Sequence, residues 1–492
     1  MFSDLSSTSI IFLFLAVALA LAFEFVNGFH DTANAVATVI YTNSLKSTQA
    51  VVWSGAWNFL GVLTSSGAVA FGILALLPVE LILTVGSAAG FAMVFSLLLS
   101  AIIWNLGTWY LGLPASSSHT LIGSILGVGM ANAMLKSGAT FGDGVNWEKA
   151  REVGISLLVS PLFGFAAAAA LLLAMKMVVK RPELYREPEA GKTPPLWIRC
   201  ILILTCTGVS FAHGSNDGQK GMGLILLILI GILPGSFAVN LALEPSAISR
   251  VTMASQSALA TFAQRAGGAQ VQGPEAAAEI SAFLQTHQAP TARTFASLAG
   301  MTADIGQVLD GQTSLSKVVN ADRVRLRTEV YLVSEAITHL TVQGLAGSQE
   351  ESAGLLGFRY EMEGVIRYIP IWVKLAVALA LGCGTMIGWK RIVVTVGEKI
   401  GKTHLSYAQG AAAETVAALT IAAADIGGWP VSTTHVLSSG VAGTMAANHS
   451  GLQMNTMRNL LLAWVLTLPV CVFLGAMLFA LGINIVVGLG LR

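Results

Sequence analysis

Two short polar motifs interrupt apolar stretches of this sequence, and each contains an acid and a histidine. The first, FVNGFHD, spans Phe25–Asp31 and follows a run of almost pure hydrocarbon side chains. The second, FAHGSND, spans Phe211–Asp217 and lies in similar surroundings. A carboxylate at the centre of a membrane segment costs at least about 2.5 kcal/mol, and such groups commonly bind ions or carry protons. We therefore expect Asp31 and Asp217 to bind a cation or a proton.

Two further motifs place hydroxyl groups after a proline. PASSSHT spans Pro114–Thr120, and PVSTTHV spans Pro430–Val436. Each reads as the start of a helix, where free backbone N–H groups and the positive end of the helix dipole attract anions. Hydroxyl donors there would complete a receptor for a tetrahedral oxyanion, although Ser and Thr at such positions can also simply cap the helix. The candidate anion ligands are Ser116, Ser117, Ser118, Ser432, Thr433 and Thr434.

The four motifs form two matched pairs, which indicates an internal repeat. From Asp31 to Pro114 is 83 residues, and from Asp217 to Pro430 is 213 residues. The difference of 130 is close to the length of residues 244–367, which have a different composition. The predicted first half has an odd number of membrane segments, so the second half would start on the opposite side of the membrane. This is the pattern of an inverted-topology repeat, whose binding site is expected where the two halves meet near the bilayer midplane.

The composition defines the class of protein. Hydrophobic residues make up 54% of the chain, charged residues 11%, and the mean hydropathy is +0.72. The sequence therefore predicts an all-α integral membrane protein with about 10 to 12 membrane segments, some of them broken or re-entrant because Gly and Pro interrupt them. Separate segments are expected at 198–212 and at 221–243. A net charge of +1 and the absence of one long basic patch argue against nucleic-acid binding.

Charge distribution predicts the organisation and orientation of the chain. Basic residues cluster between 176 and 199, which places that loop in the cytoplasm and, by counting segments, the N-terminus outside. Two more crossings would return the chain to the cytoplasm before a mainly helical soluble insert. The predicted parts are a first transmembrane repeat (1–180), a basic cytoplasmic loop (181–197), the first part of the second repeat (198–243), the insert (244–367) and the remainder of the second repeat (368–492).

Together these motifs resemble the inorganic phosphate transporters of the PiT type, and most closely the bacterial low-affinity Pit branch. The resemblance covers residues 20–243 and 369–490 and rests on GFHDTANA with HGSNDGQKG and PASSSHT with PVSTTHV. It implies a helical symporter, not an enzyme, in the inner (plasma) membrane. In such a protein the signature aspartates would serve coupling and the Ser/Thr motifs would hold phosphate. An acidic position of the family, 18 residues before the motif serine, matches Glu414.

Departures from the family pattern bear on the coupling ion. Sodium-coupled relatives carry Asn-Asp-x-x-Asn in both halves, whereas the first half here has His30 before Asp31 and keeps Asn34. The second half keeps Asn216 but has Lys220 where the pattern has its last asparagine. An ammonium group there would repel sodium and could contact phosphate. We therefore expect protons to be the coupling ions. The candidate residues for binding the coupling ion or proton are Asp31, Asp217, Asn34, Asn216, Glu414 and His30.

The resemblance further implies that phosphate travels as a neutral complex with a divalent metal such as Mg²⁺, held in part by Asp31 or Asp217. No permanently bound cofactor is expected, and the sequence leaves open whether the protein is a homo-oligomer. The alternatives are a sodium-coupled phosphate transporter and a proton-coupled sulfate transporter on the same scaffold. A Ser/His hydrolase is disfavoured because no GxSxG elbow is present, and an anion channel is disfavoured by the paired aspartates.

Overall fold

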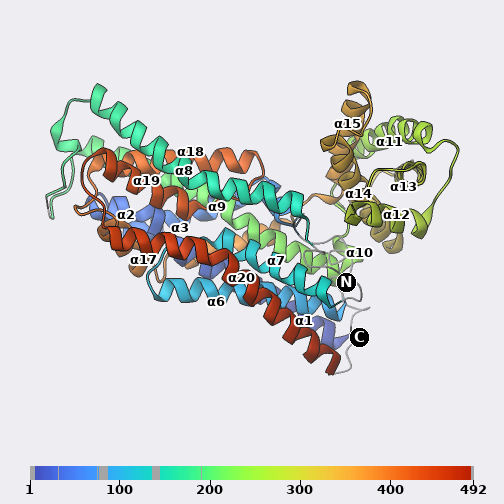
Figure 1. Ribbon diagram of the computed structural model, residues 1–492, viewed down its shortest axis with the longest axis horizontal. Helices are drawn as coiled ribbons and strands as arrows, with labels where there is room; N and C mark the ends of the chain where they lie inside the picture. Colours follow the sequence, from blue (N-terminus) through green and yellow to red (C-terminus); the bar gives the residue numbers. More distant parts are fainter. Residues whose placement is uncertain are drawn as a thin grey trace. The chain divides into compact units, whose positions relative to one another are not determined.

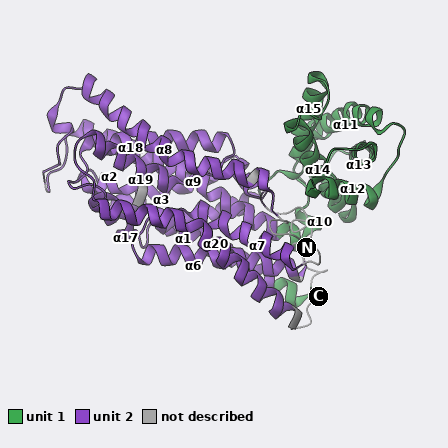
Figure 2. Cartoon of the chain, viewed as in Figure 1, with its two compact units in different colours: residues 1–10, 79–86, 229–369 green, residues 11–78, 87–228, 370–492 purple. Residues whose placement is uncertain are grey.

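The computed structural model describes residues 6–31, 33–74, 76, 87–135, 145–189, 191–286 and 288–488. Its described residues form helices and no β-strand, which confirms the predicted all-α fold (Figure 1). Contacts divide the chain into two compact units (Figure 2). The first unit comprises residues 1–10, 79–86 and 229–369, and the second comprises residues 11–78, 87–228 and 370–492.

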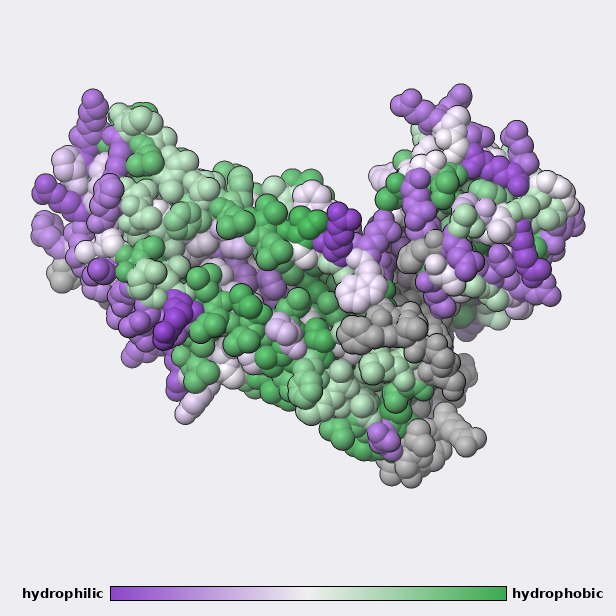
Figure 3. Space-filling view, in the orientation of Figure 1, coloured by the Kyte–Doolittle hydropathy of each residue, from purple (hydrophilic) through white to green (hydrophobic). Residues whose placement is uncertain are grey.

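The second unit contains the apolar helices and all four sequence motifs. On the face that Figure 3 shows, hydrophobic side chains cover the middle of these helices, and hydrophilic side chains gather at one end. Their bounds are α1 (Ser7–Asp31), α2 (Ala33–Tyr41), α3 (Ser47–Thr64), α4 (Ala68–Leu74), α6 (Ala88–Tyr110), α7 (Ser117–Met134), α8 (Trp147–Val178), α9 (Leu196–Ile232), α16 (Ile371–Thr385), α17 (Lys390–Val394), α18 (Tyr407–Ile426), α19 (Thr433–Ala447) and α20 (Met454–Gly488).

Among the described residues, five spans are long and apolar enough to cross a membrane, or up to seven if each of two bent helix pairs counts as one span. The sequence-based estimate of 10 to 12 segments is higher because it includes helices that are short or carry polar residues. Helices α7 and α19 are examples, since each begins at a Ser/Thr motif and is buried on nearly all sides. They fit broken helices that are enclosed by protein.

The prediction of separate segments at 198–212 and 221–243 is wrong. Helix α9 continues through the polar motif without a break. The physical reason is that Asp217 and Lys220 lie three residues apart on the helix and form an ion pair, so the helix needs no interruption to accommodate them. The segment count that placed the insert in the cytoplasm loses one crossing, and the orientation of the chain stays a prediction.

Close helix contacts recur at repeat-related positions. Gly28 on α1 and Gly214 on α9 occupy the same place in the two acidic motifs. An added Cβ at Gly28 would overlap the carbonyl oxygen of Leu381 on α16, and one at Gly214 would overlap that of Asn58 on α3. Each acidic helix therefore packs tightly on a helix from the other half of the sequence.

The helices that begin at the Ser/Thr motifs also pack on helices from the other half of the sequence. An added Cβ at Gly127 on α7 would overlap the carbonyl oxygen of Val472 on α20. At the repeat-related Gly443 on α19, it would overlap the carbonyl oxygen of Phe165 on α8. Small residues allow such close backbone approach, which is a main source of helix association in lipid. The helices of the two halves are thus interleaved. Their inverted orientation relative to the membrane stays a prediction.

Besides the ends of α1 and α9, the described part of the first unit contains a short helix α10 (Pro234–Phe237) and five longer helices. These are α11 (Pro245–Ala266), α12 (Gly273–Thr286), α13 (Ala292–Leu309), α14 (Asn320–Val342) and α15 (Gln349–Ile366). Their apolar faces enclose a core that includes Phe262, Leu326 and Phe358. A capping box starts α15, where the Ser348 hydroxyl accepts from the Glu351 N–H and the Glu351 carboxylate accepts from the Ser348 N–H. The predicted insert therefore lies within a unit that has its own hydrophobic core.

The packing of α7 on α20 gives a test of the fold. Because an added methyl group at Gly127 meets backbone, the Gly127→Ala substitution should force these helices apart and destabilise the protein by about 1–3 kcal/mol. The control is Gly107→Ala, since an added Cβ at Gly107 on α6 has no atom within 4 Å. The measurement is the melting temperature of the purified protein, followed by size-exclusion chromatography after heating. Equal melting temperatures for both variants would contradict the close contact.

Candidate functional site

The two Ser/Thr motifs form the first turns of α7 and α19 in the same way. Ser116 is the N-cap of α7 and accepts a hydrogen bond from the backbone N–H of His119 at 3.2 Å. Ser432 is the N-cap of α19 and accepts from the backbone N–H of His435 at 3.1 Å. Two of the six predicted anion ligands therefore act as helix caps.

The N-terminus of α7 brings the two predicted aspartates together. The Ser117 hydroxyl lies 3.1 Å from Asp31 Oδ2 and 3.3 Å from Asp217 Oδ2. All three side chains are buried. Asp31 ends α1 and Asp217 lies in α9, so the shared serine joins equivalent positions of the two sequence halves.

Lys220 neutralises one of these carboxylates. Its Nζ lies 2.7 Å from Asp217 Oδ2 and donates to Ser117 Oγ at 3.1 Å. The ammonium group is fully buried, and a buried charge needs a partner at such a distance. This geometry places the positive charge of Lys220 beside Asp217.

Two histidines surround the same pair of acids. His30 Nδ1 lies 3.0 Å from Asp31 Oδ1, and its Nε2 lies 3.1 Å from the hydroxyl of Thr108. His213 Nε2 lies 3.4 Å from Asp217 Oδ2 and 3.9 Å from Asp31 Oδ2, within ion-pair range of both. The aspartates are thus enclosed by groups that can donate a proton or a hydrogen bond to them.

Helix α19 reaches the cluster through its own hydroxyl groups. Thr434 Oγ1 donates to Asp31 Oδ1 at 2.5 Å. The hydroxyl of Thr433 is buried and has no hydrogen-bond partner among the described residues, and the same is true of Asp217 Oδ1. Ser118, by contrast, donates to the carbonyl oxygen of Val431 at 2.7 Å and holds the two motifs together. Unpaired buried polar atoms are costly, so each of these two atoms is available to a ligand.

Three side chains of the cluster have the composition of a cation site. Ligand atoms of Asp31, His213 and Asp217 all lie within 4.8 Å of one another. Carboxylate oxygens suit Mg²⁺, and an imidazole extends the range to transition metals. The Lys220 ammonium already occupies one side of Asp217, so a metal would compete with it for that carboxylate.

The remaining predicted coupling residues do not join the cluster through any described contact. The side chain of Asn34 lies outside the described residues. Asn216 Nδ2 donates to the carbonyl oxygen of Trp429 at 3.3 Å. Glu414 on α18 is buried and accepts from Thr205 Oγ1 at 2.6 Å, which makes it a helix-to-helix contact between α18 and α9.

Two residues of this region were not chosen from the sequence. His213 lies four residues before Asp217, a spacing that puts both on one face of α9, so the sequence did carry a signal for it. Glu24 accepts from the backbone N–H of Gly221 at 2.6 Å and from Asn27 Nδ2 at 3.3 Å. This carboxylate ties α1 to α9, and its partner is a backbone group that no side-chain pattern reveals.

A helical membrane protein with buried acids, a buried lysine and hydroxyl groups gathered at two helix N-termini has the features of a transporter rather than of an enzyme. The chain belongs to the phosphate transporter family, whose model matches residues 27–475. It is similar to the low-affinity inorganic phosphate transporter PitA of Escherichia coli (strain K12), with 44% identity over 481 residues that cover 94% of this chain and 95% of the relative. It is also similar to the low-affinity inorganic phosphate transporter of Buchnera aphidicola subsp. Acyrthosiphon pisum (strain APS), with 40% identity over 488 residues and 97% of each chain covered.

These relatives place the chain with the bacterial low-affinity Pit branch, as the motifs predicted. Among solved structures, it is similar to one titled "The sodium-dependent phosphate transporter". The TM-score is 0.51, the identity is 18%, and the match covers 96% of this chain and 98% of that chain. A likeness at this identity establishes the shared fold alone.

The shared serine gives a test of the site. Ser117→Ala removes a hydroxyl that bonds to charged groups, and hydrogen bonds of this kind contribute about 1.5–3 kcal/mol. The variant should therefore melt at a lower temperature than the wild type. Ser438→Ala is the matched control, because the buried Ser438 hydroxyl on α19 has no hydrogen-bond partner in the described part of the chain. Differential scanning fluorimetry of both variants checks this; a melting temperature of Ser117→Ala equal to that of the wild type would argue against the bridge.

Proposed function

We propose that this protein takes up inorganic phosphate by proton-coupled symport, with phosphate carried as a neutral complex with a divalent metal. The observation that carries the proposal is the convergence of Asp31, Asp217 and Lys220 on Ser117 at the N-terminus of α7. Acids for a coupling ion and donors for an anion meet there in one buried cluster.

Phosphate as the substrate is supported by the chemistry of the donors. The N-termini of α7 and α19 offer partial positive charge, and Thr433 offers a buried hydroxyl without a described partner. Lys220 is a fixed cation next to Ser117. The relatives that cover almost the whole chain are named as inorganic phosphate transporters, which supports the same substrate here.

Proton coupling is supported by the charge balance of the cluster. Two buried carboxylates face one ammonium group, so the cluster lacks one positive charge. A proton shared among Asp31, His30 and His213 would supply it, since a ring nitrogen of each histidine lies within 4 Å of a carboxylate oxygen of Asp31. Burying an uncompensated charge is strongly unfavourable, so proton binding and substrate binding would be linked.

Transport as a metal complex is supported by the energetics of the membrane potential. Moving a dianion inward against about 100 mV, inside negative, costs roughly 4.6 kcal/mol, because each charge costs about 2.3 kcal/mol. A bound divalent cation removes that cost. Asp31, His213 and Asp217 could contact the metal while it travels as cargo with the phosphate.

Sodium coupling and sulfate transport are the alternatives. The solved neighbour is titled as sodium-dependent, yet here the Lys220 ammonium lies 2.7 Å from Asp217 Oδ2, close to where a sodium ion on that carboxylate would have to bind. Sulfate is also tetrahedral but carries no proton at neutral pH, so a site lined by carboxylate acceptors suits phosphate better.

The experiment is uptake of radiolabelled phosphate into proteoliposomes, with proton and sodium gradients imposed separately and Mg²⁺ present or chelated. We expect the proton gradient to drive uptake and chelation to abolish it. Asp31→Asn should reduce uptake by at least about tenfold, because it leaves the surrounding donors without their charge partner. Asp322→Asn, in the insert, is the control that removes an acid outside the cluster.

Lys220→Asn separates the two coupling ions. It should impair proton-driven uptake and restore the Asn-Asp-x-x-Asn pattern that sodium-coupled relatives carry. Sodium-driven uptake by the wild type would overturn the interpretation of Lys220. Uptake of sulfate without phosphate would mean that the scaffold is right and the substrate wrong.

A further inference from the structure

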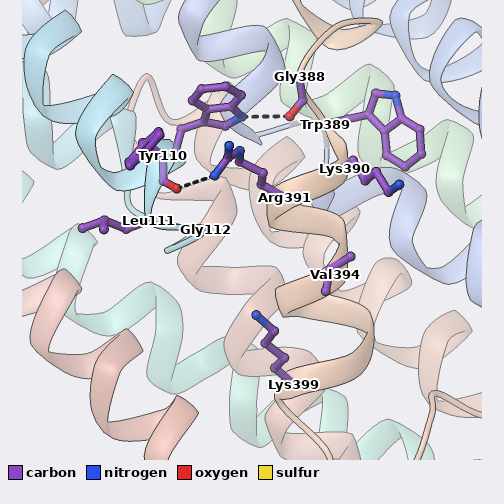
Figure 4. Close-up of a pocket in the computed structure, with 10 residues that line it drawn as sticks. Tyr110, Leu111, Gly112, Gly388, Trp389, Lys390, Arg391, Val394 and Lys399 are labelled. Carbon is purple, nitrogen blue, oxygen red and sulfur yellow. Dashed lines mark hydrogen bonds between the residues drawn. The ribbon is translucent and has the colours of Figure 1, made fainter.

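A surface pocket at the end of helix α6 combines aromatic rings with cations. It has a volume of about 640 Å³ and lies between the segment Trp109–Gly112 and the segment Gly388–Lys399 (Figure 4). Its cations are Lys390, Arg391 and Lys399. None of the three has a carboxylate within ion-pair distance among the residues that the structure describes. The pocket is therefore basic and lacks an internal counter-ion.

The arginine is held in place by the aromatic residues. Its guanidinium carbon lies 5.2 Å from the ring centre of Trp109 and 4.9 Å from that of Tyr110, and Nη1 donates to the Tyr110 carbonyl oxygen at 2.8 Å. The Trp109 indole is fixed in turn by a 2.8 Å hydrogen bond to the carbonyl oxygen of Gly388. Arg391 has five N–H donors, so most of them are left for a ligand. A preorganised guanidinium suits a phosphate group, which it can bind through two parallel hydrogen bonds.

The acid nearest to the pocket along the chain does not neutralise its cations. The nearest acid along the chain is Glu398, beside Lys399. Its Oε1 accepts a hydrogen bond from the hydroxyl of Tyr41 at 2.7 Å. The carboxylate thus has a neutral partner, and the ammonium of Lys399 stays available to an external anion.

The helix that leads to the pocket presents an apolar stripe. Leu99, Ile103, Leu106 and Tyr110 of α6 are all exposed large side chains, and their spacing places them on one face. Residues 89–110 form one of the spans long and apolar enough to cross a membrane. The stripe therefore faces lipid, and the basic pocket lies at the depth where that span ends. Aromatic and basic residues are enriched at this depth because lipid headgroups lie there.

We propose that this pocket binds the phosphate group of an anionic phospholipid. The headgroup would lie against Arg391 and Lys399, while an acyl chain follows the stripe on α6. Free inorganic phosphate could also bind the cations, but it would make no contact with the apolar stripe. A phospholipid would contact both, so the geometry favours the lipid. The pocket shares no lining residue with the cluster of Asp31, Asp217, Lys220 and Ser117, and this proposal does not depend on the proposed function.

The test is native mass spectrometry of the full-length protein, delipidated in detergent and titrated with phosphatidylglycerol. The wild type should bind one phosphatidylglycerol molecule at least about tenfold more tightly than the double variant Arg391→Gln/Lys399→Gln. Each basic group near an anionic headgroup raises the binding affinity by roughly a factor of five. The control Lys180→Gln/Arg186→Gln removes two exposed cations elsewhere and should bind like the wild type. The single variant Lys399→Gln should lose part of the affinity for phosphatidylglycerol. Because Lys399 lies on the surface, this variant tests the proposal even if the double variant fails to fold.

Two further arms identify the ligand. Phosphatidylcholine, which carries a compensating positive charge, should bind the wild type more weakly than phosphatidylglycerol, and millimolar inorganic phosphate should not displace the lipid. Equal binding of phosphatidylglycerol by the double variant and the wild type would overturn the proposal. Displacement by inorganic phosphate would reassign the pocket to the free ion, and equal binding of the two lipids would refute selectivity for an anionic headgroup.

Discussion

Burial of ionic groups away from water is the constraint on which this structure depends. Asp31 and Asp217 lie buried side by side, with the Ser117 hydroxyl within hydrogen-bond distance of both. Lys220 lies against Asp217, and His30, His213 and Thr434 supply further contacts. Taking charge out of water is so costly that every group in the cluster must be held in position. In the proposed function, a transported anion and its coupling ion change the charge balance at these same positions, which would link stability to transport.

Close backbone packing provides the positions that this cluster requires. Helices from one half of the sequence pack closely on helices from the other half at repeat-related glycines. These include Gly28, Gly127, Gly214 and Gly443. Helix α7 therefore reaches its site between helices of both halves, with its N-terminus directed at acids from α1 and α9. In lipid, such packing replaces the hydrophobic effect as the main force that joins helices.

The sequence predicted the cluster well where the residues recur. Asp31, Asp217 and Ser117 were identified because each belongs to a duplicated motif, and Lys220 because it breaks the duplication. Helix α9 was missed as a single helix because a polar run inside an apolar stretch resembles a loop, and only the internal Asp217–Lys220 pair shows otherwise. Whether Ser116 caps a helix or binds an anion depends on backbone geometry, which residue spacing alone does not determine.

A cryo-electron microscopy map of the protein in lipid nanodiscs, with phosphate and Mn²⁺ at mildly acidic pH, tests the central claim most directly. We expect phosphate density within hydrogen-bond distance, about 3 Å, of Ser117 and Thr433, with Lys220 still beside Asp217. Repeating the map with sodium in place of Mn²⁺ should add no ion between Asp31 and Asp217. Phosphate bound away from the N-termini of α7 and α19, or a sodium ion between the aspartates with Lys220 displaced, would contradict it.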